Sequence, residues 1–209
     1  VRADARSPGG HERAVSRLQV HQPVRDYPST RKAHGIDFLM EHRHLWLRSG
    51  RKTAILRIRH AIIKAARQFF DDHGFTLIDT PILAPGAAEG AGTLFPVDYF
   101  GEQAYLAQTG QLYLESACMA IGKVHRHSPT VRAEKSKTRR HLTEFWMIEP
   151  EIAYAEIGDL MNWVEQFISH IVQSVLKAHR EELGTLGRDV AALEKITAPV
   201  PRITYSETN

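Results

Sequence analysis

A run of basic residues interrupted by one carboxylate lies between positions 132 and 141 of this 209-residue chain. Six of its ten residues are Lys, Arg or His and one is an acid: Arg132-Ala133-Glu134-Lys135-Ser136-Lys137-Thr138-Arg139-Arg140-His141. Arg132 and Glu134 are two positions apart, so on a strand both side chains project from one face. Arg offers a rigid fork to phosphate oxygens, and Glu accepts a hydrogen bond from an amine. The spacing therefore suits a zwitterionic or phosphate-bearing ligand, and the ring of Phe145 on the return strand could stack on a base.

A solvated hairpin with a surface Arg–Glu ion pair is the alternative interpretation of this run. Other nucleotide and metal signals are missing from the sequence, which has no Walker-type glycine loop, no Cys-x-x-Cys pair and no dinucleotide fingerprint. His42 and His44 have no Cys or carboxylate pattern beside them, so no metal is expected there. Cys118 has no base or second Cys nearby, which favours a packed helix position over a catalytic thiol.

The composition is that of a globular protein, with 43% hydrophobic and 24% charged residues. A formal charge of +3 permits nucleic-acid binding without indicating it. No run of about eighteen apolar residues is present, so no membrane association is expected. The single cysteine and the absence of an apolar signal-peptide core at Val1 indicate a reducing compartment, and we expect a cytoplasmic protein.

The elements that would hold the basic run begin with a long helix from Arg51. Its expected inward face carries five apolar residues at spacings of three and four: Ile55, Ile58, Ile62, Ala65 and Phe69. Gly74 stands where a C-terminal cap is expected, and a strand over 75–78 should end before Pro81. Before this helix, weak alternation over 14–20 predicts a strand at the edge of another domain, followed by a proline-containing linker.

The rest of the chain reads as strands and two helices. Strands are predicted over 94–99 and 104–107 around Gly101, and over 124–131 and 143–148 on either side of the basic run. A helix over 111–120 should end at Gly122. A long amphipathic helix is predicted over 157–183, with six residues facing inward: Leu160, Val164, Phe167, Ile168, Ile171 and Val175.

Four separated segments resemble class II asparaginyl-tRNA synthetases. Residues 131–151 look like the second signature motif of that family, and 38–48 look like the entry to its catalytic domain. The helix, strand and Pro81 resemble the first motif, and 108–113 resemble the amino-acid pocket segment. The resemblance implies an α+β fold, with an antiparallel sheet flanked by helices. It further implies that 1–35 are the end of an anticodon-binding oligonucleotide-binding barrel with its hinge, and that 36–209 are the N-terminal part of the catalytic domain.

The resemblance also implies a role for each site residue. Arg132 would hold the α-phosphate of ATP and stabilise the transition state, Glu134 would contact the adenine side, and Phe145 would stack on adenine. Arg140 and His141 would complete the ATP site near the distal phosphates.

On the amino-acid side, Glu89 would bind the ammonium group of asparagine, aided by Gln108 and Gln111. Glu149 would accept a hydrogen bond from the substrate's side-chain amide and repel a carboxylate. The alternative for Glu149 is a core acid paired with a nearby arginine.

The implied activity is asparagine–tRNA ligation through an aminoacyl-adenylate, with ATP, Mg²⁺, asparagine and tRNA as reactants and a homodimer as the expected assembly. The family's third motif and acidic Mg²⁺ ligands have no counterpart in these 209 residues. The chain alone is therefore expected to be inactive, with no metal ligand of its own. Two alternatives stay open: a vestigial nucleotide-binding or dimerisation module, and an ATP-dependent enzyme that makes asparagine without tRNA.

Overall fold

The computed structural model describes residues 1–7, 9–30, 32–87, 94–135, 138 and 140–207. It divides into two compact units, Val1–Ser49 and Gly50–Asn209. In the described part of the chain, no helix is both long and apolar enough to cross a membrane.

The first unit has little regular structure. Strands β1 (Arg2–Ala3) and β2 (His11–Glu12) pair antiparallel, and two short helices follow, α1 (Ile36–Glu41) and α2 (Arg43–Trp46). The strand expected over 14–20 is wrong. Its apolar residues are exposed, Val15 by 73% and Leu18 by 78%. No described strand pairs with this segment, so its backbone lacks the ladder hydrogen bonds that define a strand.

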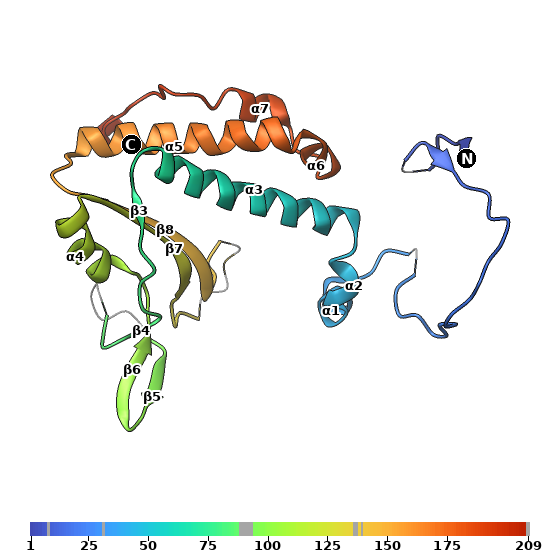
Figure 1. Cartoon of the computed structure of the whole chain (residues 1–209), viewed down its shortest axis with the longest axis horizontal. Coiled ribbons are helices and arrows are strands. Elements are labelled where there is room, and N and C mark those ends of the chain that lie inside the picture. The colour runs from blue at the N-terminus through green and yellow to red at the C-terminus, as the bar shows by residue number, and fades with distance from the viewer. Residues whose placement is uncertain (8, 31, 88–93, 136–137, 139, 208–209) are drawn as a thin grey trace. The chain divides into compact units, whose positions relative to one another are not determined.

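The second unit opens with the long helix α3 (Gly50–Asp72), as predicted (Figure 1). Gly74 follows it with a φ of 74°, a left-handed conformation that glycine adopts without steric cost. Strand β3 (Thr76–Leu77) comes next. The predicted inward face is partly wrong, because Ile55 and Ile62 are 38% exposed while Ala54, Ala66 and Phe70 are buried.

Two three-stranded sheets form around these elements. Strands β4 (Leu83–Ala84), β5 (Pro96–Tyr99) and β6 (Glu102–Leu106) make an antiparallel sheet in the order β4-β6-β5. Strands β7 (Lys123–Val131) and β8 (Glu144–Ile152) pair antiparallel over nine residues each, and β3 joins β7 in parallel. Both predicted hairpins are confirmed, and β8 runs four residues beyond its predicted end.

Helices cover both faces of β7 and β8. Helices α3 and α5 (Ile157–Ala178) lie side by side along one face (Figure 1). There Phe69, Phe70 and Phe75 form a buried cluster against Ile148 and Trp163. Helix α4 (Gln111–Ile121) packs on the other face, as Leu114 and Cys118 bury against Val124 of β7.

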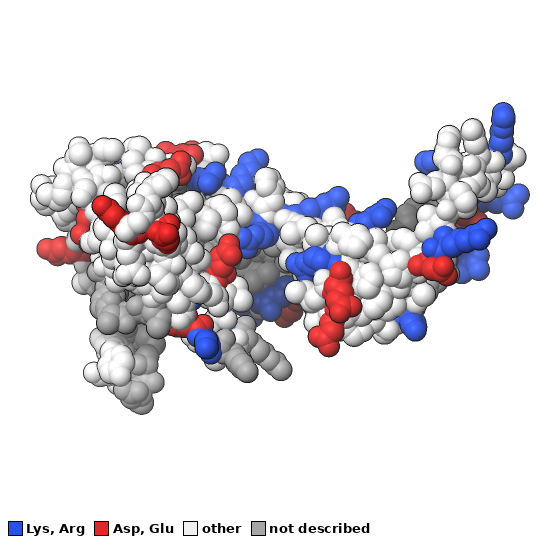
Figure 2. Space-filling view, turned by 90° about the horizontal axis from the view of Figure 1, so that it is seen from below, with Lys and Arg blue, Asp and Glu red and all other residues white. Residues whose placement is uncertain are grey.

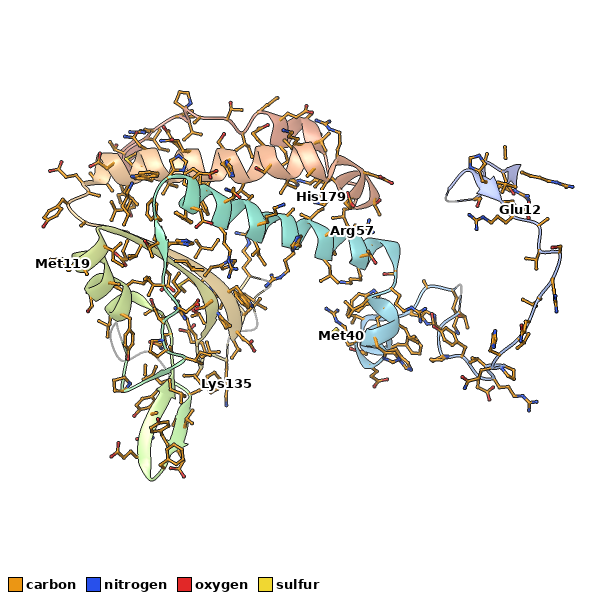
Figure 3. All side chains as sticks on the ribbon, viewed as in Figure 1. Glu12, Met40, Arg57, Met119, Lys135 and His179 are labelled. Carbon is orange, nitrogen blue, oxygen red and sulfur yellow. The ribbon has the colours of Figure 1, made fainter. Side chains whose placement is uncertain are left out.

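The predicted helix over 157–183 is two helices. Helix α5 stops at Ala178, and α6 (Arg180–Thr185) restarts after His179, whose φ is −135°. The bend lets Leu183 join Val175 and Leu176 in a buried cluster. Near His179, Arg57 of α3 donates to Glu182 over 3.2 Å; His179 and Arg57 are labelled in Figure 3. Helix α7 (Val190–Glu194) and a short 3₁₀ turn (Tyr205–Glu207) complete the described chain.

The predicted inward face of α5 is also partly wrong. Leu160, Val164 and Ile168 are each 46% exposed and line an apolar groove of about 660 Å³ beside β8. Trp163, which was not predicted to face inward, packs against the phenylalanine cluster. Phe167 also packs there, as predicted.

Candidate functional site

A cavity of about 450 Å³ lies over the face of β7 and β8 that α4 also covers. Its lining comes from three places: the segment that leads into α4, the residues just beyond β7, and residues 147 and 149–151 of β8. Nine residues line it: Gln108, Thr109, Gln111, Arg132, Glu134, Met147, Glu149, Pro150 and Glu151. Five of the residues singled out from the sequence are therefore brought together, although 108 and 149 are far apart in the chain.

Arg132 and Glu134 lie just beyond β7, which ends at Val131. The backbone amide of Arg132 still donates to Thr143 O over 2.9 Å, so the two chains stay paired there. Both side chains are exposed and line the cavity, although both residues lie beyond the strand whose alternation was expected to place them on one face. The Arg132 guanidinium lies 5.6 Å from the centre of the Phe145 ring, within cation–π range.

Gln108 and Gln111 stand on the segment that leads into α4. Gln111 donates from its side chain to Glu115 over 2.9 Å, and its backbone amide donates to Thr109 Oγ1 over 3.1 Å. A second cavity of about 410 Å³ shares Gln108 and Thr109 and extends to Pro85 and Ala87. Glu89 lies outside the described residues.

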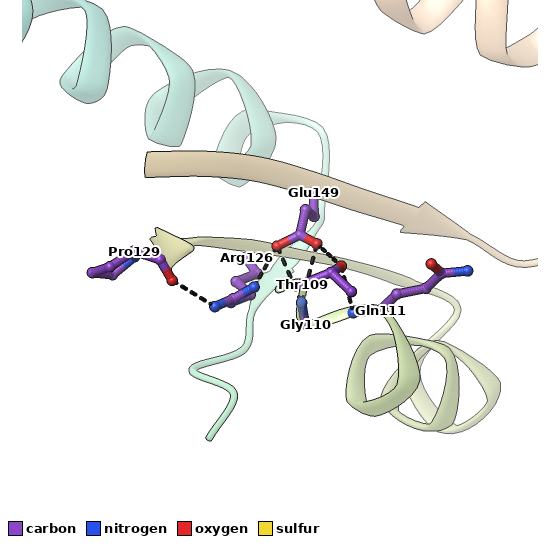
Figure 4. A network of polar contacts seen from close by, with 6 residues as sticks. All are labelled: Thr109, Gly110, Gln111, Arg126, Pro129 and Glu149. Carbon is purple, nitrogen blue, oxygen red and sulfur yellow. Dashed lines mark hydrogen bonds and ion pairs between the residues drawn. The ribbon is translucent and has the colours of Figure 1, made fainter. Parts of the chain in front are cut away.

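Glu149 is the centre of a polar network (Figure 4). Its Oε1 accepts from the Thr109 hydroxyl and from the backbone N–H of Gly110 at 3.1 Å. Its Oε2 accepts from Arg126 Nη1 over 2.6 Å. The side chain is 11% exposed and lines the cavity. Glu149 is thus both a cavity residue and an acid paired with an arginine, which joins the two interpretations that the sequence left open.

Arg126 is the site residue that sequence reasoning missed. It stands directly opposite Glu149 in the β7–β8 register, and its side chain has no exposed surface. The one available signal was an arginine in a predicted strand between His125 and His127, where buried strands are ordinarily apolar.

The remaining predicted ATP residues do not line the cavity. Thr138 holds a turn by contacting the His141 ring and by accepting from the His141 backbone amide over 3.1 Å. Arg140 and His141 are exposed on this turn, and Phe145 is half-buried on β8. The structure thus brings Arg132 and Glu134 to the cavity, but not Arg140, His141 or Phe145.

The acidic residues of the cavity influence one another. Burial raises the pKa of the Glu151 carboxyl, and the nearby carboxylates of Glu115 and Glu149 raise it further. Among the described residues, no group of three His, Cys, Asp or Glu side chains is placed to hold a metal ion. The described residues therefore offer no ready set of protein ligands for Mg²⁺.

Comparison with known proteins identifies the family of this chain. Residues 35–209 match the family described as tRNA synthetases class II (D, K and N), and the chain belongs to this family. The α+β fold expected from the sequence is confirmed by solved structures.

The curated relatives carry a more specific name than the family does. The chain is 60% identical to the asparagine–tRNA ligase of Koribacter versatilis, over 99% of the chain and 48% of that protein. It is 54% identical to the enzyme of Sorangium cellulosum, over 99% of the chain and 47% of that protein. The chain thus spans about half the length of the curated relatives it matches.

Solved structures agree with these relatives. The structure of asparaginyl-tRNA synthetase from Pyrococcus horikoshii complexed with asparaginyl-adenylate superposes with a TM-score of 0.89 and 40% identity, over 98% of this chain and 48% of that one. The Entamoeba histolytica enzyme in complex with asparaginyl-adenylate gives a TM-score of 0.73 and 30% identity, over 88% of this chain and 40% of that one. The predicted resemblance to asparaginyl-tRNA synthetases is confirmed.

Proposed function

We propose that the chain is part of an asparagine–tRNA ligase. The observation that carries the proposal is the single cavity in which Arg132 and Glu134 meet Gln108, Gln111 and Glu149. A phosphate-binding guanidinium and a set of amide and carboxylate groups in one cavity suit a reaction between an amino acid and a nucleotide. The asparagine–tRNA ligases among the relatives support this choice over other amino acids.

Arg132 is proposed as the catalytic residue of the ATP side. A positioned guanidinium stabilises a transition state most where negative charge develops. During adenylate formation that place is the α-phosphate. Glu134 beside it would contact the adenine side of ATP. Phe145 would offer its ring to adenine after the Arg132 guanidinium, now 5.6 Å from that ring, turns toward phosphate. Arg140 and His141 would close over the distal phosphates from their turn.

Gln108, Gln111 and Glu149 are proposed as the amino-acid side, together with Glu89. Glu149 would accept a hydrogen bond from the side-chain amide of asparagine. An aspartate carboxylate would present only acceptors to it. Discrimination by such polarity can be large, because the rejected ligand leaves buried groups unpaired.

The reaction needs no protein nucleophile. An oxygen of the asparagine carboxylate attacks the α-phosphorus of ATP, and the bond to the leaving pyrophosphate breaks, which gives asparaginyl-adenylate. A terminal ribose hydroxyl of tRNA then attacks the carbonyl carbon, releasing AMP and a proton. The protein residues position the reactants and stabilise charge. Mg²⁺ would neutralise phosphate charge when bound, with ligands from outside the residues described here.

Partners and assembly complete the proposal. We propose that 1–35 are the end of an anticodon-binding domain and 36–209 a part of the catalytic domain, in a cytoplasmic enzyme. On the face shown in Figure 2, Lys and Arg are interspersed with Asp and Glu, so charge alone does not locate the tRNA surface. A homodimer is supported by apolar side chains that α3 and β3 leave exposed: Ile55, Leu56, Ile62 and Leu77.

The test uses the intact protein that contains this chain. Purified protein is assayed for ATP–pyrophosphate exchange with asparagine and with aspartate, and for charging of tRNA. Asparagine-dependent exchange with charging supports the ligase. ATP-dependent conversion of aspartate and ammonia to asparagine without tRNA would instead support the amidating enzyme. ATP binding with neither reaction would support a vestigial module.

A further inference from the structure

The guanidinium of Arg126 is buried directly behind the cavity. Its side chain has no exposed surface, and two of its nitrogens have partners. Nη1 donates to Glu149 Oε2 over 2.6 Å, and Nη2 donates to the carbonyl of Pro129 over 3.0 Å. The second contact is made within β7, so it fixes the guanidinium to the strand that carries it. A buried ion requires compensation of this kind, because removal from water is costly.

The chain makes room for this side chain at one position. A Cβ added to Gly110 would lie 2.4 Å from Arg126 Cδ and 2.9 Å from Arg126 Nε. Because Gly110 has no side chain, Arg126 can extend under the start of α4 and reach Glu149. The same Gly110 gives its backbone N–H to Glu149 over 3.1 Å. Gly110, Arg126 and Glu149 therefore form one packed unit.

The donors around Glu149 nearly fill its capacity. An ionised carboxylate has about four acceptor positions. The Thr109 hydroxyl and Arg126 each donate to one oxygen, and the Gly110 N–H lies 3.1 Å from Oε1 and 3.4 Å from Oε2. The side chain is still 11% exposed and lines the cavity. Room is thus left for about one further donor from a ligand. The charge of Glu149 is at the same time balanced by Arg126, so the pair presents polarity to the cavity more than net charge.

We propose that Arg126 is a positioning residue that sets the choice of a neutral carboxamide ligand over a carboxylate. It holds the Glu149 oxygens in one orientation, with one acceptor position directed to the cavity. A carboxamide N–H satisfies that position, whereas a carboxylate has no hydrogen to offer. The inference rests on the proposed function, since the carboxamide is the side chain of asparagine.

The experiment compares variants of the intact protein in amino-acid-dependent ATP–pyrophosphate exchange. Arg126→Met keeps the length of the side chain and removes its charge and donors. Without Arg126 the Glu149 carboxylate is no longer held toward the cavity and can turn away from it. We therefore expect the KM for asparagine to rise at least tenfold and the preference for asparagine over aspartate to fall at least tenfold, while the KM for ATP stays within twofold. Arg126→Lys, which keeps the charge and one donor, should recover part of both losses. The double variant with Glu149→Gln should be no worse than the more damaged single variant.

A matched control uses an ion pair of the same length elsewhere. Arg180 and Glu194 also lie 2.6 Å apart, but the Arg180 side chain is 58% exposed. Arg180→Met should leave both KM values unchanged. If Arg126→Met does not yield folded protein, Arg126→Gln decides in its place, because it removes the charge and retains a donor.

The outcomes separate the two claims. The role of Arg126 would be overturned if the wild type catalyses exchange with asparagine while folded Arg126→Met or Arg126→Gln keeps the same asparagine KM and the same preference. The proposed function would then still stand. A parallel rise of the KM for ATP would assign Arg126 a merely structural role and also overturn it. Wild-type protein without asparagine-dependent exchange would overturn the proposed function and this inference together.

Discussion

The guanidinium of Arg126 meets the carboxylate of Glu149 over 2.6 Å, one from β7 and the other from the paired position of β8. The arginine is fully buried, and the glutamate is the member of the pair that reaches the cavity. Removal of one partner from such a pair leaves an uncompensated charge in a poorly solvated place. Substitutions at either residue should therefore affect the chemistry of the cavity as well as stability.

Glu149→Gln in the intact protein should weaken the rejection of aspartate. Without the carboxylate, Arg126 becomes an unpaired cation behind the cavity and favours a negatively charged ligand. We expect discrimination to shift toward aspartate by about 1–3 kcal/mol. The measurement is the ratio of kcat/KM for asparagine and aspartate, with Glu144→Gln on the same strand as control. If both values fall together at a constant ratio, Glu149 has a structural role only.

Arg132→Ala should slow adenylate formation by about a hundredfold or more. That scale corresponds to the loss of one positioned donor at the transition state, about 3 kcal/mol. Single-turnover adenylation with saturating ATP is the measurement, and Arg188→Ala on the exposed segment after α6 serves as control. A mutant that forms adenylate at the wild-type rate would show that the Arg132 side chain is needed only for its contact with Phe145.

Gly110→Ala should destabilise the fold because the new methyl group would overlap Arg126 and approach Thr80 Oγ1 at 2.8 Å. Overpacking of this kind typically costs about 1–3 kcal/mol. Gly184→Ala is the matched control, since a Cβ there meets nothing within 4 Å and the residue lies in α6. The control should be neutral or slightly stabilising. Urea unfolding of both variants provides the comparison, and equal midpoints would contradict the packing of Arg126 beneath Gly110.

Stability should fall as the pH is lowered below about 6.5, the ordinary pKa of histidine. Burial lowers the pKa of His125, which stacks on Phe70 at 4.7 Å, and burial likewise lowers the pKa of His127. Above pH 6.5 both the folded and unfolded states are neutral at these rings. Below it the histidines of the unfolded state bind protons, whereas the buried rings of the folded state stay neutral until the pH reaches their lower pKa. The free energy of unfolding therefore falls over this range.

The test of this pH dependence is urea unfolding at pH 7.5 and at pH 5.5. His125→Phe should reduce the loss of stability on acidification, because the ring stays apolar at both values. The exposed His21→Phe is the control and should leave the loss unchanged. An equal loss in wild type and His125→Phe would show that other groups, such as the carboxyls, control the acid side.

Much of the local structure could be predicted from short-range signals. Helix α3 ends before Gly74, α4 ends before Gly122, and the β5–β6 turn includes Gly101, three glycines with φ between 74° and 91°. Left-handed backbone favours glycine so strongly that its position is readable without tertiary contacts. The loop between β7 and β8 was likewise predicted from its basic, polar run, and Arg132 and Glu134 line the cavity although both lie beyond Val131, where β7 ends.

Other features needed the tertiary structure. The end of helix α5 before His179 could not be predicted from the sequence, because the apolar periodicity continues from Val175 to Leu183. The exposed Leu160, Val164 and Ile168 match the helical pattern of a core face, yet their burial depends on what lies beside β8. A periodic pattern fixes which side chains share a face, while the neighbouring elements decide how deeply that face is buried.

The sequence by itself determined the family, because four separated segments of the chain resemble it and the family match covers residues 35–209. The pairing of Arg126 with Glu149 was decided only by the tertiary structure. The two residues are 23 positions apart, and they meet because β7 and β8 pair in one register. A shift of that register by one residue would turn Arg126 or Glu149 to the opposite face. Register is a long-range property of the folded sheet, which is why the partner that controls Glu149 could not be found from local pattern alone.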